Sequence, residues 1–175
     1  MTYQIDPQHS AAQFKVRHMM IANVKGEFDR VRGTVDFDPA DPASTKIEAV
    51  IDVASISTRE LDRDAHLKSA DFLDVEKFPE ITFKATGASA DGDGYKVTGF
   101  LTIHGVTNPV TLEVESVSDE VKDGWGFIRR GLTAHTHIIR KDFGLLFNMP
   151  MDGGGVVVGE KVDITLDVEI LRKPE

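Results

Sequence analysis

The sequence predicts an all-β protein, an extended antiparallel β-barrel of about eight strands with one short helix between strands. The first observation is that residues 157–171 alternate apolar and polar side chains almost without a break, which is typical of a strand with one apolar face. The second is length, because such a strand would run about 50 Å, or about 38 Å along the axis of a barrel whose strands tilt by about 40°. The third is that similar alternation recurs between short turns, as in an antiparallel meander.

The expected strands follow one another along the chain, each with one apolar face. They cover residues 10–18, 30–37, 47–53, 81–85, 95–103, 110–114, 127–139 and 157–171. Turn residues separate them: the Asp-Pro cluster at 38–42 ends the second strand, and residues 91–94, 107–109 and 122–124 are predicted hairpin turns. A sheet of about eight strands can close into a barrel, which removes its exposed edges.

The one predicted helix lies between the third and fourth strands. Ser57-Thr-Arg-Glu60 matches a capping box, with Ser57 as the N-cap and Glu60 at the third helical position. The helix then runs to about Lys68, with Leu61 and Ala65 on its apolar side.

Three cationic or titratable side chains would share one face of this helix. Arg59, Arg63 and His66 are spaced i, i+4 and i+7. At the mouth of a barrel such a stripe could hold a phosphate group. The alternative is a solvated face whose charges pair with the chain's many carboxylates.

Composition limits the classes of partner. The chain has 175 residues without a long linker or repeat, so we expect one domain over residues 1–175. Its 20 basic and 29 acidic residues give a net charge of −9, which disfavours nucleic acid or an anionic membrane as a partner held by electrostatics. It has no cysteine, which excludes disulfides and thiolate zinc sites. The N-terminus shows no signal-peptide pattern and no segment is apolar for long enough to span a bilayer, so we expect a cytoplasmic protein, or an exported one if a leader has been removed.

Small residues at inward positions bear on whether the barrel is filled. Eight-stranded barrels are either filled by side chains or hold one small ligand. The small inward residues predict a hollow lumen, and the alternative is that the glycines mark bulges or bends. These residues are Ala12, Gly33, Ala49, Ala85, Gly99 and Ala134.

Histidines leave one chemical alternative open, although no nucleotide-binding loop, nucleophile elbow or metalloprotease motif occurs. His135 and His137 could form half of a metal site, but their parity places them on the outer face, where a plain surface pair is the other interpretation. His18 follows Phe14 and Val16 on the inward face. It either lines one end of the lumen or hydrogen-bonds to the backbone near the strand end.

Two connecting segments are unusually apolar. Residues 143–151 contain six large apolar side chains, and residues 19–21 are Met-Met-Ile. Exposed apolar clusters indicate a lid over an apolar cavity or a subunit interface, so a homodimer is one expectation. Methionine suits both roles because it repacks easily.

Several short motifs, in a fixed order along nearly the whole chain, resemble the YceI-like family, also called polyisoprenoid-binding proteins. They are Tyr3-x-Ile5-Asp6-x-x-His9-Ser10, the run from Arg63 to Phe72, Lys77-Phe78-Pro79-x-Ile81-Thr82-Phe83, the run from Leu101 to Thr107, and Arg140-Lys141-Asp142-Phe143-Gly144. The resemblance implies a lipocalin-like barrel whose lumen holds a long isoprenoid or a similar amphiphilic lipid.

We therefore predict a protein that binds a long-chain isoprenoid lipid, of the polyprenyl phosphate or quinone type, as a carrier or sequestering protein without catalysis or cofactor. Two alternatives remain. One is a lipid-modifying enzyme or a metal-dependent protein that uses His18 or the His135/His137 pair, and the other is a stress-linked structural protein whose apolar loops bind a partner chain. The lipid head group is expected near Arg63, His66, His18 and Arg140. The predicted ligand-binding residues are Phe14, Val16, His18, Val35, Phe37, Ala49, Ile51, Arg63, His66, Phe83, Gly99, Leu101, Leu112, Ala134, Ile138, Arg140, Phe143, Leu146, Ile164 and Leu166.

Overall fold

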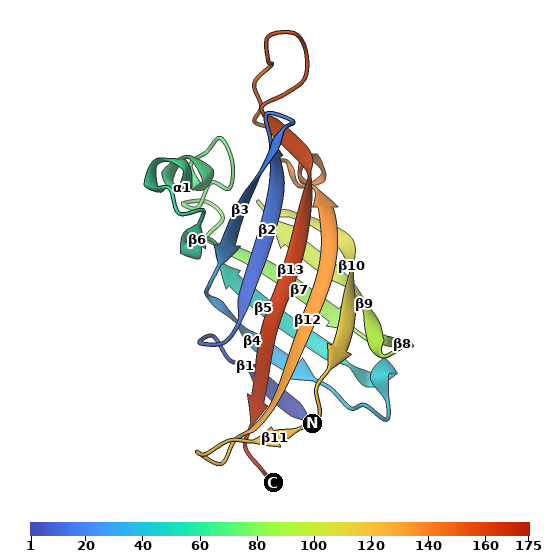
Figure 1. Ribbon diagram of the computed structural model, residues 1–175. Helices are drawn as coiled ribbons and strands as arrows, with labels where there is room; N and C mark the ends of the chain where they lie inside the picture. Colours follow the sequence, from blue (N-terminus) through green and yellow to red (C-terminus); the bar gives the residue numbers. More distant parts are fainter.

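Thirteen strands form one antiparallel sheet in the computed structural model, which describes residues 1–175 (Figure 1). The strands are β1 (Thr2–Ile5), β2 (Ala11–His18), β3 (Ala22–Phe28), β4 (Val31–Asp36), β5 (Lys46–Asp52), β6 (Ile56–Ser57), β7 (Glu80–Thr86), β8 (Ser89–Asp91), β9 (Gly94–Ile103), β10 (Val106–Val117), β11 (Val121–Lys122), β12 (Ile128–Ile139) and β13 (Val158–Arg172). The helices are α1 (Leu61–Lys68) and the 3₁₀ turns η1 (Pro42–Ser44), η2 (Val53–Ser55) and η3 (Arg140–Phe143). The predicted all-β class with one short α-helix is confirmed.

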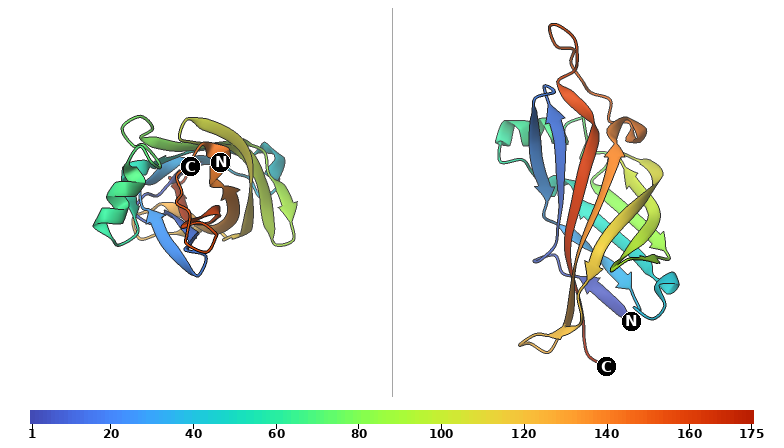
Figure 2. Two further views of the ribbon diagram at one scale, coloured as in Figure 1. Left: turned by 90° about the horizontal axis from the view of Figure 1, so that it is seen from above. Right: turned by 45° about the vertical axis from the view of Figure 1, so that its right-hand side comes forward.

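Eight of the strands close the barrel. The ring runs β12, β10, β9, β7, β5, β4, β1 and β13, and it closes because β13 pairs with β12. Seen from above, the strands surround the barrel axis and α1 lies outside the ring (Figure 2). We call the end with the β2–β3 turn the upper end. The end with both chain termini is the lower end (Figure 1).

The long strand β13 explains a difference from the prediction. On one side it pairs with β12 over its whole lower and middle length, from Arg172 to Lys161. On the other side it has two partners, because β1 pairs with its lower end and β2 with its upper part. The ring is therefore completed by β1, which was not predicted. The predicted strand at residues 10–18 extends the upper wall with β3 and β6.

The strands that the sequence prediction missed are short or polar. β3 carries few large apolar residues, and Gly26 interrupts its inward row. A Cβ at Gly26 would lie 2.5 Å from Cζ of Phe14 on the neighbouring strand, so glycine makes room for that ring. The apolar pattern of β3 is weak because the Phe14 ring of β2 covers part of its inner face, where β3 itself has only a glycine.

One predicted turn was wrong. Residues 107–109 lie inside β10, and the hairpin turn is formed by His104 and Gly105, both in the left-handed region with φ of 54° and 72°. Pro109 is tolerated in a strand here because β10 pairs with β12 only from Glu113 onward, so the missing N–H costs no ladder hydrogen bond on that side.

The helix begins later than predicted. Its N-cap is Glu60, whose side chain accepts a hydrogen bond from the Asp62 N–H, whereas Ser57 belongs to β6. The chain turns sharply at Arg59, which has φ of 64°, so Arg59 lies outside the helix. The predicted stripe of three side chains is therefore reduced to Arg63 and His66.

The buried face of α1 also differs from the prediction. Leu61 is 85% exposed and Ala65 is exposed, whereas Asp64 is buried. Asp64 accepts hydrogen bonds from the backbone N–H and the hydroxyl of Thr58. This polar contact ties the helix to the segment that follows β6, and Leu67 is the helical side chain that packs against the apolar cluster of the barrel.

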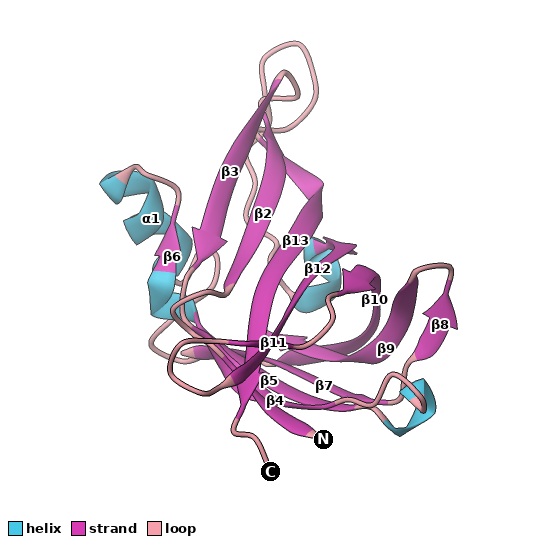
Figure 3. Ribbon diagram, turned by 60° about the horizontal axis from the view of Figure 1, so that its bottom comes forward, coloured by secondary structure: helices cyan, strands magenta, loops and turns pink.

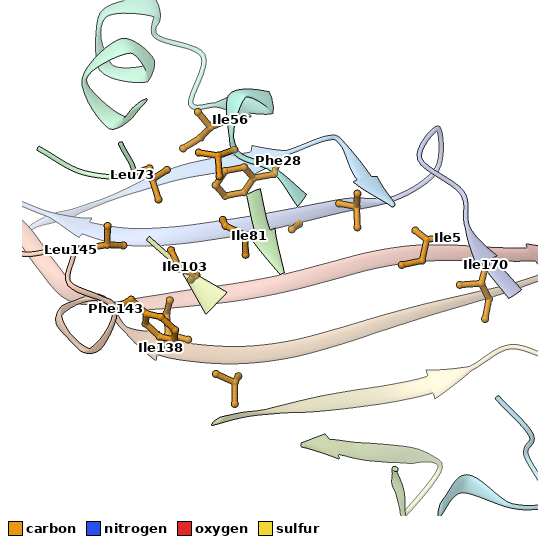
Figure 4. Packing of buried hydrophobic residues seen from close by; sticks show 14 of the residues in the cluster. Ile5, Phe28, Ile56, Leu73, Ile81, Ile103, Ile138, Phe143, Leu145 and Ile170 are labelled. Carbon is orange, nitrogen blue, oxygen red and sulfur yellow. The ribbon is translucent and has the colours of Figure 1, made fainter. Parts of the chain in front are cut away.

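The buried apolar cluster lines the barrel from end to end. Ile5 and Ile170 lie toward the lower end, and Ile138, Phe143 and Leu145 lie toward the upper end (Figure 4). Many other inward apolar side chains pack against this cluster while remaining partly accessible. Partial accessibility on inward faces indicates that side chains do not fill the interior.

Candidate lipid-binding cavity

A cavity of about 570 Å³ occupies the interior of the barrel. Of its 49 lining residues, 41 are hydrophobic. Lining residues at the lower end, such as Ile5 and Ile170, are buried, whereas His18 and Met149 at the upper end are exposed. The cavity therefore opens at the upper end. Its volume falls within the range of about 300–1,000 Å³ that is common for small-molecule sites.

The neighbouring strands β12 and β13 show how the sequence builds the wall. The even-numbered residues of β13 from Val162 to Ile170 line the cavity, and so do the even-numbered residues of β12 from Leu132 to Ile138. The intervening side chains point outward, among them His135 and His137. The period-two pattern that predicted the strands also identified their apolar inner face.

Seventeen of the twenty predicted ligand-binding residues line the cavity. Their contact with a ligand stays a prediction. They are Phe14, Val16, His18, Val35, Phe37, Ala49, Ile51, Arg63, His66, Phe83, Leu101, Leu112, Ala134, Ile138, Arg140, Ile164 and Leu166.

Three predicted residues lie elsewhere. Gly99 is covered by the ring of Phe83, and a Cβ there would lie 2.6 Å from Cζ of that ring. Phe143, the last residue of η3, is buried in the apolar cluster, and Leu146 is 63% exposed outside the cavity. The glycine at position 99 therefore makes room for the Phe83 ring and leaves no open space in the lumen there, which differs both from the predicted hollow and from the alternative of a bulge or bend.

Arg140 is a buried cation at the upper end of the cavity wall. It is 3% exposed, and its guanidinium donates to the carbonyl oxygens of Gly159 at 2.8 Å, Leu145 at 2.7 Å and Val158 at 3.3 Å. All three hydrogen bonds go to neutral carbonyls. Burial lowers the pKa of Arg140, yet an arginine stays protonated at neutral pH. The wall therefore carries a positive charge that no hydrogen-bonded carboxylate neutralises.

Arg63 and His66 place two more polar groups at the mouth. Arg63 donates from Nε to the hydroxyl of Thr58 and from Nη2 to its carbonyl, both at 2.7 Å. His66 pairs through Nε2 with Asp71 at 2.9 Å. Its ring packs edge-on against Phe72 and Phe147, with distances between ring centroids of 5.1 and 5.0 Å. The aromatic contacts join the 66–72 segment to the loop after η3.

Asn148, which the sequence did not predict as a site residue, closes the base of that loop. Asn148 donates from Nδ2 to the Val158 carbonyl at 2.8 Å and accepts from the Val158 N–H at 3.0 Å. With Arg140, it fixes residues 144–157 beside the opening. Its position among large apolar residues is the one sequence feature that could have identified this asparagine. Its partner Val158 lies ten positions away, so no local pattern predicts the contact.

A second missed residue lies near the lower end of the cavity. Thr45 is buried and lines the wall, and its hydroxyl is the one buried side-chain oxygen or nitrogen without a hydrogen-bond partner. Buried hydroxyls are normally paired. A ligand oxygen that reached this depth would find a partner there.

A network of hydrogen-bonded polar and charged side chains closes the lower end. The fully buried Tyr3 donates its hydroxyl proton to Glu120 at 2.6 Å and accepts from Nε of Arg130 at 2.9 Å. Arg172 donates to the same carboxylate at 3.0 Å. The hydrogen bonds from Tyr3 and then Arg172 hold the pKa of Glu120 below its ordinary value. β11 and the turn after it lie across this end (Figure 3).

One group of side chains on the outer surface has the composition of a metal site. Ligand atoms of Asp6, His9 and Glu169 lie within 4.8 Å of one another. However, Nη1 of Arg129 donates to both Asp6 and Glu169 at 2.7 Å and so supplies the positive charge. Burial alone would raise the pKa of Asp6, but the hydrogen bonds from His9 and Arg129 outweigh it and lower that pKa.

The histidines of the alternative hypothesis do not converge with other ligands. His135 pairs through Nε2 with Glu115 at 2.5 Å, and His137 is exposed on the outer face. Neither belongs to a group of three metal-ligating side chains. No helix of the structure has the length and apolar character needed to cross a bilayer.

Sequence comparisons give a consistent family. The model of the YceI-like domain matches residues 3–170. A UPF0312 protein of Yersinia pestis and the YceI protein of Escherichia coli are each 38% identical to the chain over 169 residues. These matches cover 95% of this chain and 84% and 85% of the two relatives.

Structural comparisons agree with the sequence matches. The YceI protein of Campylobacter jejuni has a TM-score of 0.74 at 30% identity, with 90% of each chain covered. Two more distant structures share the fold. BcnA of Burkholderia cenocepacia has a TM-score of 0.80 at 24% identity over 94% of this chain and 98% of its own. A polyisoprenoid binding domain from Saccharophagus degradans has a TM-score of 0.69 at 17% identity over 98% of both chains.

Proposed function

Because this chain belongs to the YceI-like family, we propose that it binds a long-chain isoprenoid or a similar amphiphilic lipid inside the barrel and carries or sequesters it without chemical change. The observation that carries the proposal is the cavity of about 570 Å³ with its predominantly hydrophobic wall. The whole chain would act as one lipid-binding domain. The domain from Saccharophagus degradans is named for polyisoprenoid binding, and its shared fold is compatible with this ligand class.

The energetics favour a long apolar tail. Each buried CH₂ contributes about 0.8 kcal/mol, so about ten buried carbons contribute about 8 kcal/mol. Association costs at least about 4 kcal/mol, which a short tail would barely offset. The cavity extends from Val158 near the mouth to Ile5 near the closed end, so it can bury a tail along its length.

The charges at the mouth favour a polar or anionic head group. Arg140 contributes a buried charge whose hydrogen bonds go only to carbonyls, and Arg63, His66 and His18 line the same end. A guanidinium has five N–H groups, so Arg140 retains donors beyond the three bonds it makes. Hydrogen bonds from charged donors contribute about 1.5–3 kcal/mol each. A polyprenyl phosphate therefore fits this arrangement better than the corresponding alcohol.

Organic extraction of the purified protein, followed by mass spectrometry, tests the proposal. We expect a prenyl lipid in about equimolar amount, or uptake of added polyprenyl phosphate by lipid-free protein. The matched control is the Ala134→Phe variant, whose new ring would project into the cavity. Absence of any lipid, together with failure to bind added polyprenyl phosphate or quinone, would contradict the proposal.

A further inference from the structure

Five large apolar side chains are exposed together at the upper end of the barrel. The β2–β3 turn presents Met20 at 57% exposure and Ile21 at 80% exposure, together with Met19, and the loop after η3 presents Leu146 and Met149. We call these five residues the apolar rim. Both segments form the upper end of the molecule (Figure 1). Scattered exposed apolar residues are normal, but a contiguous group at a cavity opening marks an interaction surface.

The two segments are joined into one surface. The Met19 N–H donates to the Val157 carbonyl at 2.8 Å, and Gly155 lies against the sulfur of Met20. Met19 and Met20 both have positive φ, of 49° and 62°, where glycine or asparagine would be the less strained choice. The turn therefore presents two large flexible side chains at positions where backbone preference favours small ones.

The hairpin beneath this turn is cationic in an otherwise acidic protein. The hairpin of β2 and β3 contains Lys15, Arg17 and Lys25 against a single carboxylate, Glu27, although the whole chain has a net charge of −9. Lys15 and Lys25 lie directly opposite each other on β2 and β3. Lys15 is 4.0 Å from Asp163, but neither Arg17 nor Lys25 forms an ion pair. Like charges directly opposite each other destabilise a strand pair, and the Asp163 carboxylate pairs with only one of the two lysines.

We propose that the apolar rim and the cationic hairpin dock on the surface of an anionic phospholipid bilayer, with the cavity mouth facing the membrane. Exposed apolar residues would enter the headgroup region, and Arg17 and Lys25 would lie near lipid phosphates. His18 and Met149 line the cavity at this end, so a tail could pass between bilayer and barrel without crossing water. This last step rests on the proposed lipid-binding function, whereas docking itself does not.

Flotation with vesicles that contain no isoprenoid tests docking separately from cavity binding. We expect binding to vesicles of phosphatidylcholine with phosphatidylglycerol, weaker binding to phosphatidylcholine alone, and a decrease as salt rises above 0.1 M. The double variant Met20→Ser/Ile21→Ser should bind at least about ten-fold less, because two large apolar side chains are removed. Lys25→Gln should bind about five-fold less, the factor that one lysine contributes near an anionic surface.

Matched controls lie away from the rim. Phe100→Ser removes an exposed aromatic residue from the outer face of β9, and Lys96→Gln removes a lysine from the same strand. Both should bind vesicles as the parent does. The single tryptophan, Trp125, lies in the turn after β11 at the lower end, so its fluorescence should not shift with vesicles (Figure 1). The variant Ile21→Trp/Trp125→Phe should show a blue shift with anionic vesicles only.

The outcomes separate the two proposals. Equal loss in the Phe100→Ser control, or absence of binding to anionic vesicles, overturns docking. A rim variant that loses self-association in sedimentation while keeping vesicle binding would assign the rim to a second copy of the chain and also overturns docking. If vesicles do not bind but extraction recovers a prenyl lipid, docking alone fails. If vesicles bind but no lipid is recovered or taken up, the lipid-binding function fails.

Discussion

The two ends of the barrel differ in how their charged side chains are paired: the lower end is closed and the upper end is open. At the lower end, Tyr3 and Glu120 bind each other through a hydrogen bond, and the two arginines Arg130 and Arg172 share the one carboxylate of Glu120. At the upper end, Arg140 makes hydrogen bonds only to carbonyls, and large apolar side chains are exposed. Charged groups that bind one another therefore seal one end, whereas the other end combines a buried cation that has no carboxylate partner with the opening of the cavity.

The largest expected effect is a difference in the free energy of unfolding between variants at the lower end and variants at the upper end. Tyr3→Ala should lower the free energy of unfolding by about 3–5 kcal/mol, because it removes a fully buried aromatic ring and leaves Arg130 and Glu120 without their shared partner. Ile21→Ser at the upper end should change it by no more than about 0.5 kcal/mol. Urea unfolding measures both values. Similar losses at both ends would show that the rim is a structural element.

The next test fills the space between the ends. Ala134→Phe should reduce affinity for a prenyl lipid by about 2–3 kcal/mol, since the ring displaces several tail carbons at about 0.8 kcal/mol each. The melting temperature of the lipid-free protein should stay near that of the parent. His137→Phe, on the outer face of the same strand, is the control. A clear fall in melting temperature for Ala134→Phe alone would indicate overpacking of a filled core.

A third test concerns the charge at the mouth. Arg63→Ala and Arg140→Ala, made singly, should each weaken binding of a polyprenyl phosphate by about 1.5–3 kcal/mol, and weaken binding of the alcohol less. Because Arg140 also holds the loop, Asn148→Ala is its control, releasing the same loop without a change of charge. Titration calorimetry with both ligands measures the difference. Equal losses for phosphate and alcohol would remove these arginines from head-group recognition.

The smallest effect is the pH dependence of the sealed end. The pKa of Glu120 is lower in the folded protein than in the unfolded chain, so the unfolded chain binds more protons as the pH falls. The resulting stabilisation is complete above the ordinary glutamate pKa of about 4.3 and is lost as the pH falls through the folded pKa. Glu120→Gln should flatten this part of the curve of urea midpoint against pH. An unchanged slope would show that Glu120 contributes nothing to acid sensitivity.

The sequence predicted the wall of the cavity better than its ends. Strands such as β12 and β13 alternate over many residues, so both their existence and their inner face follow from periodicity. β1 has four residues and β3 has an inner face interrupted by Gly26, so neither carries a strong local pattern. Which strand closes the ring depends on the length of β13, which has room for two partners on one side.

The polar details could not be predicted because their partners are distant or belong to the backbone. Arg140 was expected to meet a phosphate, but its position depends on carbonyls of residues 145, 158 and 159. Leu146 and Phe147 are neighbours in a loop without a period, and only Phe147 lines the cavity. Likewise, the N-cap is Glu60 and not the predicted Ser57, and Asp64 binds Thr58 across the intervening turn.

Both chain termini lie at the sealed end, on the side opposite the opening (Figure 1). Anything attached to either terminus, whether an affinity tag, a fluorescent protein or a solid support, would therefore sit away from the mouth. A layer of molecules tethered by a terminus would present the openings to the solution in one common direction. The same barrel could then serve as an oriented capture surface for apolar compounds, with no need to choose between N-terminal and C-terminal attachment.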